Sequence, residues 1–382
     1  MPIESLPLAR CVGRILRDDI CAERDQPPFD RVAMDGIAGD SDTWRCGQLR
    51  LKLQGVQAAG APQMRLARKD HAIEVMTGAI LPADCDCVVP VEQIDIDDGY
   101  ARIRASAVLT PYRNVHRRGS DARQGSPLLA SGTRLRAPEI AVAASAGMAH
   151  VRVSCPPAIA VVSTGDELVE PGQPIADFQV RRSNAHAIAA ALMQRGLDRV
   201  SDDHIRDDES ILLQRLALHL GQHDVLILSG GVSAGRFDYV PKALKQLGVE
   251  EVFHRIAQRP GAPMWFGVGP TGQAVFGLPG NPVSTLICLI RYVIPAMAVS
   301  MGTQGGVPER LALAAPVTVD GPRACFLPVA IEHDDSGRPW VRPRPTNGSG
   351  DFVSLAGTDG FVELPAGPMT HGQGFLTSVY RW

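Results

Sequence analysis

Three acidic side chains stand just beyond predicted strands in the middle of this 382-residue chain. Glu167, Asp207 and Asp238 each follow a run of residues that has the length of a strand. Carboxylates that meet at one edge of a sheet suit a hard cation such as Mg²⁺, which is usually shared with a phosphate. The alternative is that each acid caps a helix or lies in solvent. Three acids at the same edge favour the metal site.

A glycine-rich segment, Ser229–Gly235, joins a predicted strand to a predicted helix. Glycine lets the backbone approach a ligand closely, and exposed amides at the start of a helix favour phosphate or another oxyanion. The candidate binding residues in this segment are Ser229, Gly230, Gly231 and Ser233. A plain turn is the alternative, because the segment contains neither a Walker sequence nor G-x-G-x-x-G.

Two further loops carry groups that suit an anion. In Leu278–Ser284, Pro282 is a favoured first helical residue, which puts Ser284 in the first turn, where its hydroxyl and nearby amides can face an oxyanion. Arg255 and Arg259 lie four residues apart, and their forked guanidinium groups can each hold a phosphate by two hydrogen bonds. An ordinary turn and solvated surface arginines are the alternatives.

An α/β domain must position these loops. Within residues 151–303 the predicted strands are Ala158–Val162, Asp198–Ile205, Asp224–Leu228 and Ala274–Leu278. The predicted helices are Asn184–Arg195, Glu209–Leu220, Tyr239–Leu247 and Pro282–Met301. Alternation at this spacing implies right-handed crossovers and a doubly wound parallel sheet. In such sheets the ligand lies beyond the carboxyl ends of the strands. The four loops that begin there are 163–168, 206–208, 229–238 and 278–284.

The composition sets the wider class of protein. Hydrophobic residues make up 45% and charged residues 21%, which is typical of a folded chain, and the length predicts several domains. A net charge of −3 and only 5% aromatic residues predict no nucleic-acid partner. We expect no membrane segment and a cytoplasmic protein, because neither a signal sequence nor an unbroken apolar span is apparent. The scattered cysteines are expected to be reduced.

Eight segments, in this order, resemble the molybdopterin molybdenumtransferase family, which includes bacterial MoeA and the gephyrin E domain. They are Pro28–Gly36, Met76–Gly78, Arg118–Asp121, Ser163–Leu168, Ser229–Gly235, Arg259–Pro263, Gly277–Ser284 and Gly348–Gly350. One such segment is weak evidence, whereas eight in the family's order over almost the whole chain are specific.

The resemblance implies a multi-domain α/β plus β fold. Its parts are a central doubly wound parallel-sheet domain, a small C-terminal β-barrel and elongated β-rich N-terminal domains. The implied domains are a discontinuous domain I (1–24 and 120–150), an inserted domain II (25–119), a molybdopterin-binding domain III (151–303) and a barrel domain IV (304–382). The short apolar runs of 304–382, cut by Gly, Pro and Asp, independently predict strands.

The implied reaction belongs to molybdenum cofactor biosynthesis. Molybdate and adenylylated molybdopterin are its substrates, Mg²⁺ assists cleavage of the adenylate, AMP leaves, and molybdenum is placed on the dithiolene sulfurs. The implied partners are a second copy of the chain, an upstream molybdopterin adenylyltransferase and recipient apo-molybdoenzymes. In the resulting homodimer the site lies between subunits. Whether the enzyme inserts molybdenum or tungsten stays open.

Roles are carried over residue by residue from the matching segments. The implied catalytic residues are Asp35, Thr77, Glu167, Asp207 and Asp238, of which Glu167, Asp207 and Asp238 are also the metal ligands. The implied substrate-binding residues are Asp121, Ser229, Gly230, Gly231, Ser233, Arg255, Arg259, Pro263, Ser284, Arg342 and Ser349. Arg342 is included because it or Arg344 is the expected replacement for a family lysine that this chain lacks.

Three departures from the family pattern stand near the expected site. Ala262 replaces that lysine, Arg31–Val32 replaces an Asn-Ser pair, and Arg182 replaces an aspartate. They motivate an alternative, a divergent non-catalytic paralogue that binds or carries molybdopterin or its metallated form. The three retained acids at the predicted strand ends argue for the enzyme.

Overall fold

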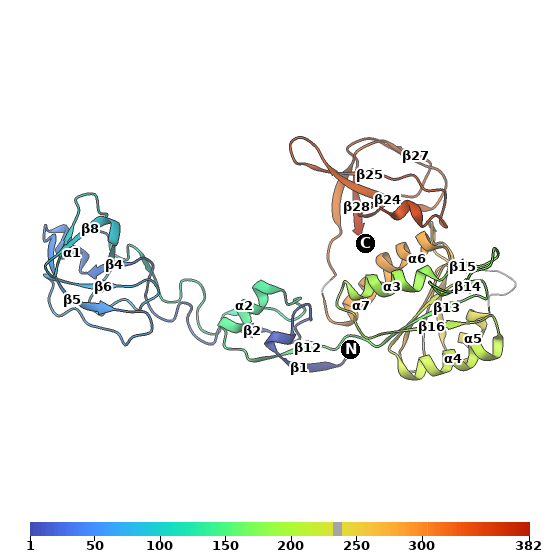
Figure 1. Ribbon diagram of the computed structural model, residues 1–382, viewed down its shortest axis with the longest axis horizontal. Helices are drawn as coiled ribbons and strands as arrows, with labels where there is room; N and C mark the ends of the chain where they lie inside the picture. Colours follow the sequence, from blue (N-terminus) through green and yellow to red (C-terminus); the bar gives the residue numbers. More distant parts are fainter. Residues whose placement is uncertain (232–238, 304) are drawn as a thin grey trace. The chain divides into compact units, whose positions relative to one another are not determined.

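A computed structural model describes residues 1–231, 239–303 and 305–382 (Figure 1). The chain divides into two compact units. Unit 1 contains Met1–Ser5, Gly13–Arg17 and Arg152–Trp382, and unit 2 contains Leu6–Val12 and Asp18–Val151. β1 (Ile3–Pro7) pairs with β12 (His150–Ser154).

Unit 2 is built on a six-stranded sheet in the order β7-β4-β6-β5-β9-β8. Its strands are β4 (Gly36–Gly39), β5 (Arg50–Gln57), β6 (His71–Val75), β7 (Cys87–Pro90), β8 (Ile94–Asp97) and β9 (Tyr100–Ile103). Alternate residues pack on opposite faces, Ala72 in one core and Ile73 in the other. The smaller elements are β2 (Ile20–Cys21), β3 (Arg31–Val32), β10 (Val115–His116), β11 (Pro127–Leu129), α1 (Ser41–Arg45) and α2 (Ala137–Ser145).

The central sheet of unit 1 has the order β16-β13-β17-β21-β20-β18. Its strands are β13 (Ile159–Thr164), β16 (Val200–Ile205), β17 (Val225–Ser229), β18 (Glu250–His254), β20 (Trp265–Val268) and β21 (Ala274–Leu278). The first four in the sheet order are parallel, which confirms the predicted parallel sheet. β20 and β18 extend it as an antiparallel edge that the sequence pattern did not predict.

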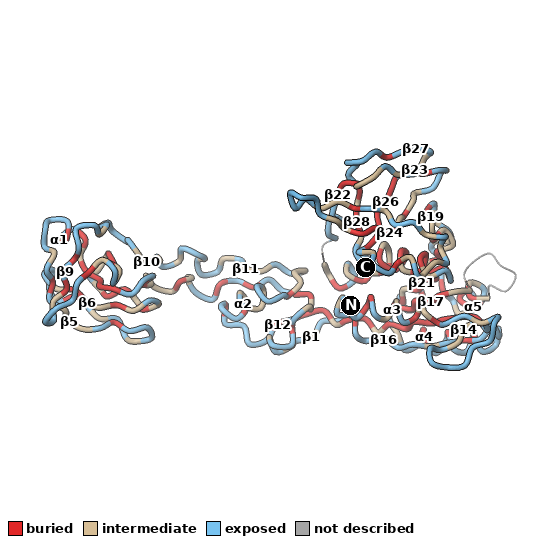
Figure 2. Tube along the Cα trace, turned by 45° about the horizontal axis from the view of Figure 1, so that its top comes forward, coloured by how far each residue is buried: buried red, intermediate tan, exposed pale blue. Residues whose placement is uncertain are grey.

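Helices cover both faces of this sheet. Ile159 and Val161 pack under α3 (Ser183–Met193) and α6 (Pro282–Cys288), whereas Ala160 and Val162 pack under α4 (Glu209–Gln222) and α5 (Val240–Gln246). Figure 1 shows the two pairs of helices on opposite sides, and the buried residues in Figure 2 follow the strands between them. The doubly wound arrangement is thereby confirmed.

The predicted helix Pro282–Met301 is not regular. It consists of α6, a π-helical turn η3 (Leu289–Val293) and α7 (Ile294–Ser300). Pro295 explains the break, because proline supplies no N–H for the helical bond and crowds the preceding turn. Pro282–Ser300 is long and apolar enough to cross a membrane, but half of it is buried, and Ile287 and Val293 are fully enclosed. This helix forms part of the core.

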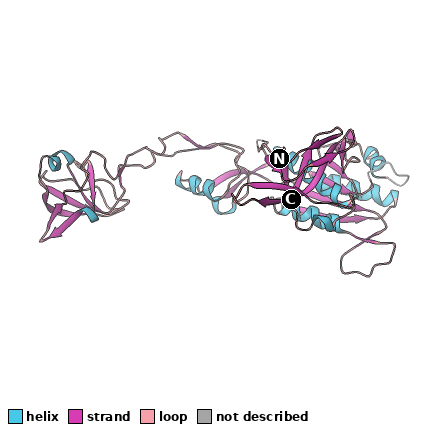
Figure 3. Ribbon diagram, turned by 90° about the horizontal axis from the view of Figure 1, so that it is seen from above, coloured by secondary structure: helices cyan, strands magenta, loops and turns pink. Residues whose placement is uncertain are grey.

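The C-terminal part of unit 1 is a closed barrel. Its strands are β22 (Glu309–Leu313), β24 (Ala324–His333), β25 (Pro339–Pro343), β26 (Gly360–Leu364) and β28 (Leu376–Arg381), closed by pairing of β24 with β26. Two short strands, β23 (Val317–Val319) and β27 (Met369–His371), pair with each other. Phe326 and Phe361 of the barrel belong to the same core as α3 and α6. Figure 3 shows the strand-rich barrel beside the helices.

A two-residue strand links the α/β part to the barrel. β19 (Gln258–Arg259) pairs in parallel with β24, with Gln258 opposite Ala324 and Arg259 opposite Cys325. A further short pair in this unit is formed by β14 (Leu168–Val169) and β15 (Val180–Arg181), which run parallel.

Candidate functional site

Two loops at the carboxyl edge of the central sheet carry predicted acids. Thr164 at the end of β13 lies opposite Ile205 at the end of β16, so Glu167 and Asp207 follow neighbouring strands. The amide of Asp207 donates to an oxygen of Asp166 at 3.4 Å, which ties the loops together. We refer to residues 163–168 and 206–208 as the acidic rim.

The backbone of Gly165 shapes the acidic rim. Its φ of +137° is one that other residues rarely adopt, and a Cβ there would collide with the carboxylate of Glu167. Glu167 and Asp207 are both exposed at the surface of the acidic rim. Asp208 has the helix-capping role instead. The Ser210 hydroxyl and then the Ile211 amide donate to its carboxylate and lower its pKa.

The predicted metal ligands are only partly within the described residues. Asp238 and Ser233 lie outside the described residues. Among residues 1–231, 239–303 and 305–382, no three His, Cys, Asp or Glu side chains gather closely enough to hold a metal ion. Glu167 and Asp207 fit Mg²⁺ as oxygen donors, because Mg²⁺ in proteins commonly takes one or two carboxylates and completes its shell with phosphate and water.

The next two loops along the edge are held by Asn184. Its Nδ2 donates to Ser229 Oγ at 2.9 Å and to the carbonyl of Gly280 at 2.8 Å. The amide of Gly230 donates to the carbonyl of Leu278 at 3.2 Å. A Cβ on Gly280 would lie only 3.7 Å from Gly230 Cα, so the two backbones run close together. These contacts join the loops after β17 and β21.

Two polar atoms at this edge are buried without a hydrogen-bond partner in the described part of the chain, Thr164 Oγ1 and Asn184 Oδ1. A Cβ on Gly231 would lie 2.8 Å from that Thr164 oxygen, so the hydroxyl faces the glycine loop. Buried polar atoms normally have partners, which indicates that a ligand or water completes this region.

Beyond β21 the edge opens into a cavity of about 1420 Å³. Its walls are the 258–263 loop, the start of α6 and the barrel. Its lining includes Arg259, Pro263, Asn281, Ser284, Asp320, Arg323, Arg344 and Ser349. Three arginines against one carboxylate make the lining positive. We refer to this space as the cationic cavity.

The predicted serines of the cationic cavity come together. Asn281 Nδ2 donates to Ser349 Oγ at 2.8 Å, and the amide of Val283 donates to the carbonyl of Ser349 at 3.1 Å. Ser284 is buried in the first turn of α6. The loop 345–350 of the barrel is therefore docked on the start of this helix.

The structure separates other predicted substrate residues from this cavity. Arg342 donates to Glu332 at 2.7 Å and lines a smaller space of about 320 Å³ with Trp340. Arg344 lines the cationic cavity, as one of the two cations expected to replace the lysine absent at Ala262. Arg255 has a φ of +72° and donates its amide to Met264, and it is not among the cavity's lining residues.

Sequence reasoning missed three residues at these sites, Asn184, Asn281 and Arg323, as ligand-facing or loop-holding groups. Asn281 stands inside the Gly277–Ser284 segment that resembles the family, and Asn184 lies two residues after the departure at Arg182, so a signal existed for both. Arg323 follows Gly321-Pro322, which indicates only a turn. Its contribution depends on barrel pairings that no local pattern reveals.

In unit 2 the structure brings Asp35 and Thr77 together. The amide and the hydroxyl of Thr77 donate to Asp35 Oδ1 at 2.6 Å and 2.7 Å. These two bonds, the amide first, hold the pKa of the Asp35 carboxyl below its ordinary value. The loops that carry the two residues meet although they are 42 positions apart.

Asp121 lies in a chain of polar contacts with Arg31. His116 Nε2 is 2.9 Å from Asp121, and Arg31 is 3.1 Å from His116 Nδ1. Because a guanidinium only donates, His116 Nδ1 accepts from Arg31, and the N–H at Nε2 donates a hydrogen bond to the Asp121 carboxylate. The departure at Arg31 thus has a structural partner, a histidine that in turn contacts a predicted site residue.

The departure at Arg182 has a structural role as well. The side chain is buried and donates to Ser163 Oγ at 3.1 Å, to Glu170 at 2.8 Å and to Asp202. Its charge is therefore used within the fold rather than offered to a ligand, since a buried charge must be paired.

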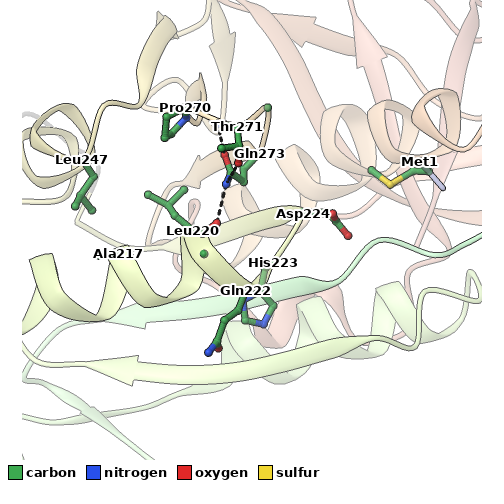
Figure 4. A pocket seen from close by; sticks show the side chains of 12 residues that line it. Met1, Ala217, Leu220, Gln222, His223, Asp224, Leu247, Pro270, Thr271 and Gln273 are labelled. Carbon is green, nitrogen blue, oxygen red and sulfur yellow. Dashed lines mark hydrogen bonds between the residues drawn. The ribbon is translucent and has the colours of Figure 1, made fainter.

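A further cavity of about 620 Å³ lies at the opposite, amino-terminal edge of the central sheet. Asp224 and Gln273, which precede β17 and β21, are among its lining residues (Figure 4). Gln273 Nε2 donates to the carbonyl of Leu220 at 2.7 Å and to Thr271 Oγ1 at 2.6 Å. Its side-chain amide therefore stabilises the turn before β21 against α4. No predicted site residue lines this cavity.

Comparison with known proteins agrees with this arrangement. Residues 1–147 match the family described as MoeA N-terminal region (domain I and II), residues 160–299 match the probable molybdopterin binding domain, and residues 310–374 match the MoeA C-terminal region (domain IV).

Curated relatives match over nearly their whole length. A molybdopterin molybdenumtransferase of Synechocystis sp. is 39% identical over 97% of this chain and 93% of its own, and one of Staphylococcus epidermidis is 30% identical over 98% and 90%. A solved molybdopterin biosynthesis moeA protein of Pyrococcus horikoshii OT3 superposes with a TM-score of 0.82 at 25% identity, covering 100% of this chain and 95% of that one.

The fold and the edge loops thus define a molybdopterin-binding α/β protein with a C-terminal barrel. The chain belongs to the MoeA family of molybdopterin molybdenumtransferases. The sequence-based expectation of a transferase in molybdenum cofactor biosynthesis is confirmed at this level.

Proposed function

We propose that this chain inserts molybdate into the dithiolene of adenylylated molybdopterin and releases AMP with the help of Mg²⁺. The observation that carries the proposal is the order of chemistry along one sheet edge. Exposed carboxylates follow β16 and β13, glycine amides follow β17, and the cationic cavity lies beyond β21. An adenylylated substrate carries two phosphates and a negatively charged dithiolene, and this edge offers a partner for each.

The residues divide the work as follows. Glu167 and Asp207, with Asp238, hold Mg²⁺, which supplies charge neutralisation on the phosphates when bound. The amide of Gly231 and the buried Thr164 hydroxyl orient the phosphates. Arg259 and Arg344 bind molybdate or the dithiolene end, and Ser284 and Ser349 donate hydroxyls there. Arg344 supplies the charge that Ala262 does not, so catalysis is retained.

We further infer a cytoplasmic homodimer whose active sites lie between subunits, with the four domains at the boundaries expected from the sequence. The Asp35–Thr77 pair of one subunit then serves the edge of the other. An upstream adenylyltransferase supplies the substrate, and apo-molybdoenzymes receive the product. The alternative carrier is disfavoured, because exposed carboxylates beside phosphate-binding amides serve cleavage better than storage.

The first experiment is AMP release from adenylylated molybdopterin with Mg²⁺, with and without molybdate. Molybdate-dependent release, followed by activation of an apo-molybdoenzyme, supports the transferase. Tight pterin binding with no AMP at any molybdate or tungstate concentration supports the carrier instead.

Subunit complementation tests the shared site. Asp35→Asn and Glu167→Gln are each expected to be inactive as pure dimers. Mixed and allowed to exchange subunits, they should regain about a quarter of wild-type activity, because half of the dimers then hold one intact site. Failure to regain activity, with exchange of subunits shown by mass spectrometry, rules out a site built from two subunits.

A further inference from the structure

The π-helical turn η3 carries two neighbouring side chains, one that contacts the α/β wall of the cationic cavity and one that contacts β26, the barrel strand that pairs with the cavity-lining Phe326. The Tyr292 hydroxyl donates to Gln258 Oε1, and Gln258 belongs to the loop that forms the α/β wall. Arg291 Nε donates to Glu363 Oε2 at 3.0 Å, and Glu363 lies on β26 of the barrel. The extra residue of a π turn changes the direction in which the following side chains leave the helix.

Gln258 transmits its contact to the loop that carries Arg259. Its side chain is buried, and Nε2 donates back to the carbonyl of Pro260 at 2.8 Å. Gly261 leaves no room for movement inward, because a Cβ there would lie 2.7 Å from Cys288 Sγ. The amide of Ile256 donates to the carbonyl of Ala262 at 2.9 Å, which closes the loop on itself. The loop is thus fixed from its buried side while Arg259 stays exposed.

The surroundings of η3 strengthen these contacts. Burial raises the pKa of Tyr292 to about 12, so its hydroxyl keeps its proton and remains a donor at neutral pH. Tyr380 also donates to Glu363 Oε2, at 2.7 Å, and the guanidinium of Arg291 lies 5.1 Å from the Tyr380 ring centre. Hydrogen bonds in such a partly dry region are stronger than in water.

We propose that Tyr292 and Gln258 are positioning residues for Arg259, and that η3 sets the spacing between the α/β and barrel walls of the cationic cavity. The inference deepens the proposed function, because it rests on Arg259 binding molybdate or the dithiolene end. Neither Tyr292 nor Gln258 touches the substrate. They hold the loop in the conformation that presents the guanidinium.

The test is Tyr292→Phe, which keeps the ring and removes only the donor. The matched control is Ser154→Ala, which removes a buried hydroxyl that donates to the carbonyl of Met301, away from the cavity lining. In the full-length enzyme, Tyr292→Phe is expected to raise the KM for molybdate about tenfold, a change of about 1.4 kcal/mol. The kcat for AMP release should change less, since the chemistry is untouched. The control should leave both constants unchanged.

A second measurement does not depend on activity. Hydrogen exchange of the Gly261 and Ala262 amides should accelerate in Tyr292→Phe and stay as in the wild type in Ser154→Ala. Gln258→Met removes the same bond together with the one to Pro260, so its effects should be at least as large. The double variant should be no worse than Gln258→Met, because the Tyr292 hydroxyl acts through Gln258.

Different results overturn different statements. If the wild type releases AMP and Tyr292→Phe matches the control in KM and in exchange, the positioning role is wrong. If the wild type releases no AMP, the proposed function fails. The exchange rates then decide by themselves whether Tyr292 fixes the loop.

Discussion

The acidic rim and the cationic cavity lie along one sheet edge but are held in place in different ways. The acidic rim depends on local backbone. A glycine with a φ of +137° shapes one loop, a hydrogen bond from the Asp207 amide to Asp166 joins the two loops, and their carboxylates are exposed. The cationic cavity depends on distant contacts, because Arg259 is held through Gln258 of β19, which Tyr292 contacts from the π-helical turn η3.

The difference indicates what each group of charged side chains requires of the surrounding fold. An exposed carboxylate beside a tight turn costs the fold little and suits a cation such as Mg²⁺. A cavity that must gather three arginines needs a rigid frame, since like charges repel when nothing binds between them. Substitutions in the acidic rim should therefore affect chemistry, and substitutions around the cavity should affect affinity.

The largest expected effect is that of Glu167→Gln. Loss of a charge that neutralises the phosphates in the transition state should lower the kcat for AMP release on the order of 10²-fold or more. Asp208→Asn is the matched control, because asparagine caps a helix as well as aspartate does. If Glu167→Gln and the control have equal activity in a steady-state assay, the acidic rim has no role in catalysis.

Gly165→Ala should have the next largest effect. The added Cβ meets the Glu167 carboxylate and should displace it, lowering kcat roughly tenfold, which is a cost of about 1.4 kcal/mol. Gly172→Ala introduces similar left-handed strain at φ +87° with nothing within 4 Å. A comparable loss of activity in both variants would show that strain, rather than the position of Glu167, is responsible.

Arg344→Ala sharpens the comparison at the cavity. The arginine is about half exposed, so its loss should raise the KM for molybdate about fivefold, equivalent to roughly 1 kcal/mol, and less at high salt. Both arginines contact Glu332, Arg342 at 2.7 Å and Arg344 at 3.9 Å, but only Arg344 lines the cationic cavity. Arg342→Ala should therefore leave this KM unchanged. The reverse pattern in substrate titrations would return the role to Arg342.

The smallest effect concerns Asp35 and Thr77. Because the pKa of Asp35 is lowered in the fold, its contribution to stability is present above about pH 4 and is lost as pH falls through its folded value. Thr77→Val removes the hydroxyl bond and leaves the amide bond, so the Asp35 pKa should rise only part of the way to its ordinary value. Carboxyl NMR titration measures this directly, and an unchanged pKa contradicts the contact.

The elements that sequence reasoning located are those with local signals. β13, β17 and β21 are buried aliphatic strands, and α4 begins at a capping aspartate, so length and pattern were enough to place them within a few residues. The acids beyond β13 and β16 followed from the rule for parallel sheets.

The elements that it missed depend on partners far along the chain. β19 is a strand only because Gln258 and Arg259 meet Ala324 and Cys325. The role of Arg182, just before α3, depends on Asp202 of the edge strand β16, and Arg344 lines the cavity only once the barrel has closed. Such roles are set by tertiary packing, which short-range patterns do not encode.

The parallel pairing of β19 with β24 bears on how such proteins diverge. The wall that presents Arg259 shares main-chain hydrogen bonds and an aromatic core, Phe326 and Phe361, with the barrel. Recombination that replaced residues 304–382 with another barrel would therefore alter the anion pocket, even with every residue of the α/β part retained. We therefore expect the two segments to be inherited together and substitutions in them to co-vary.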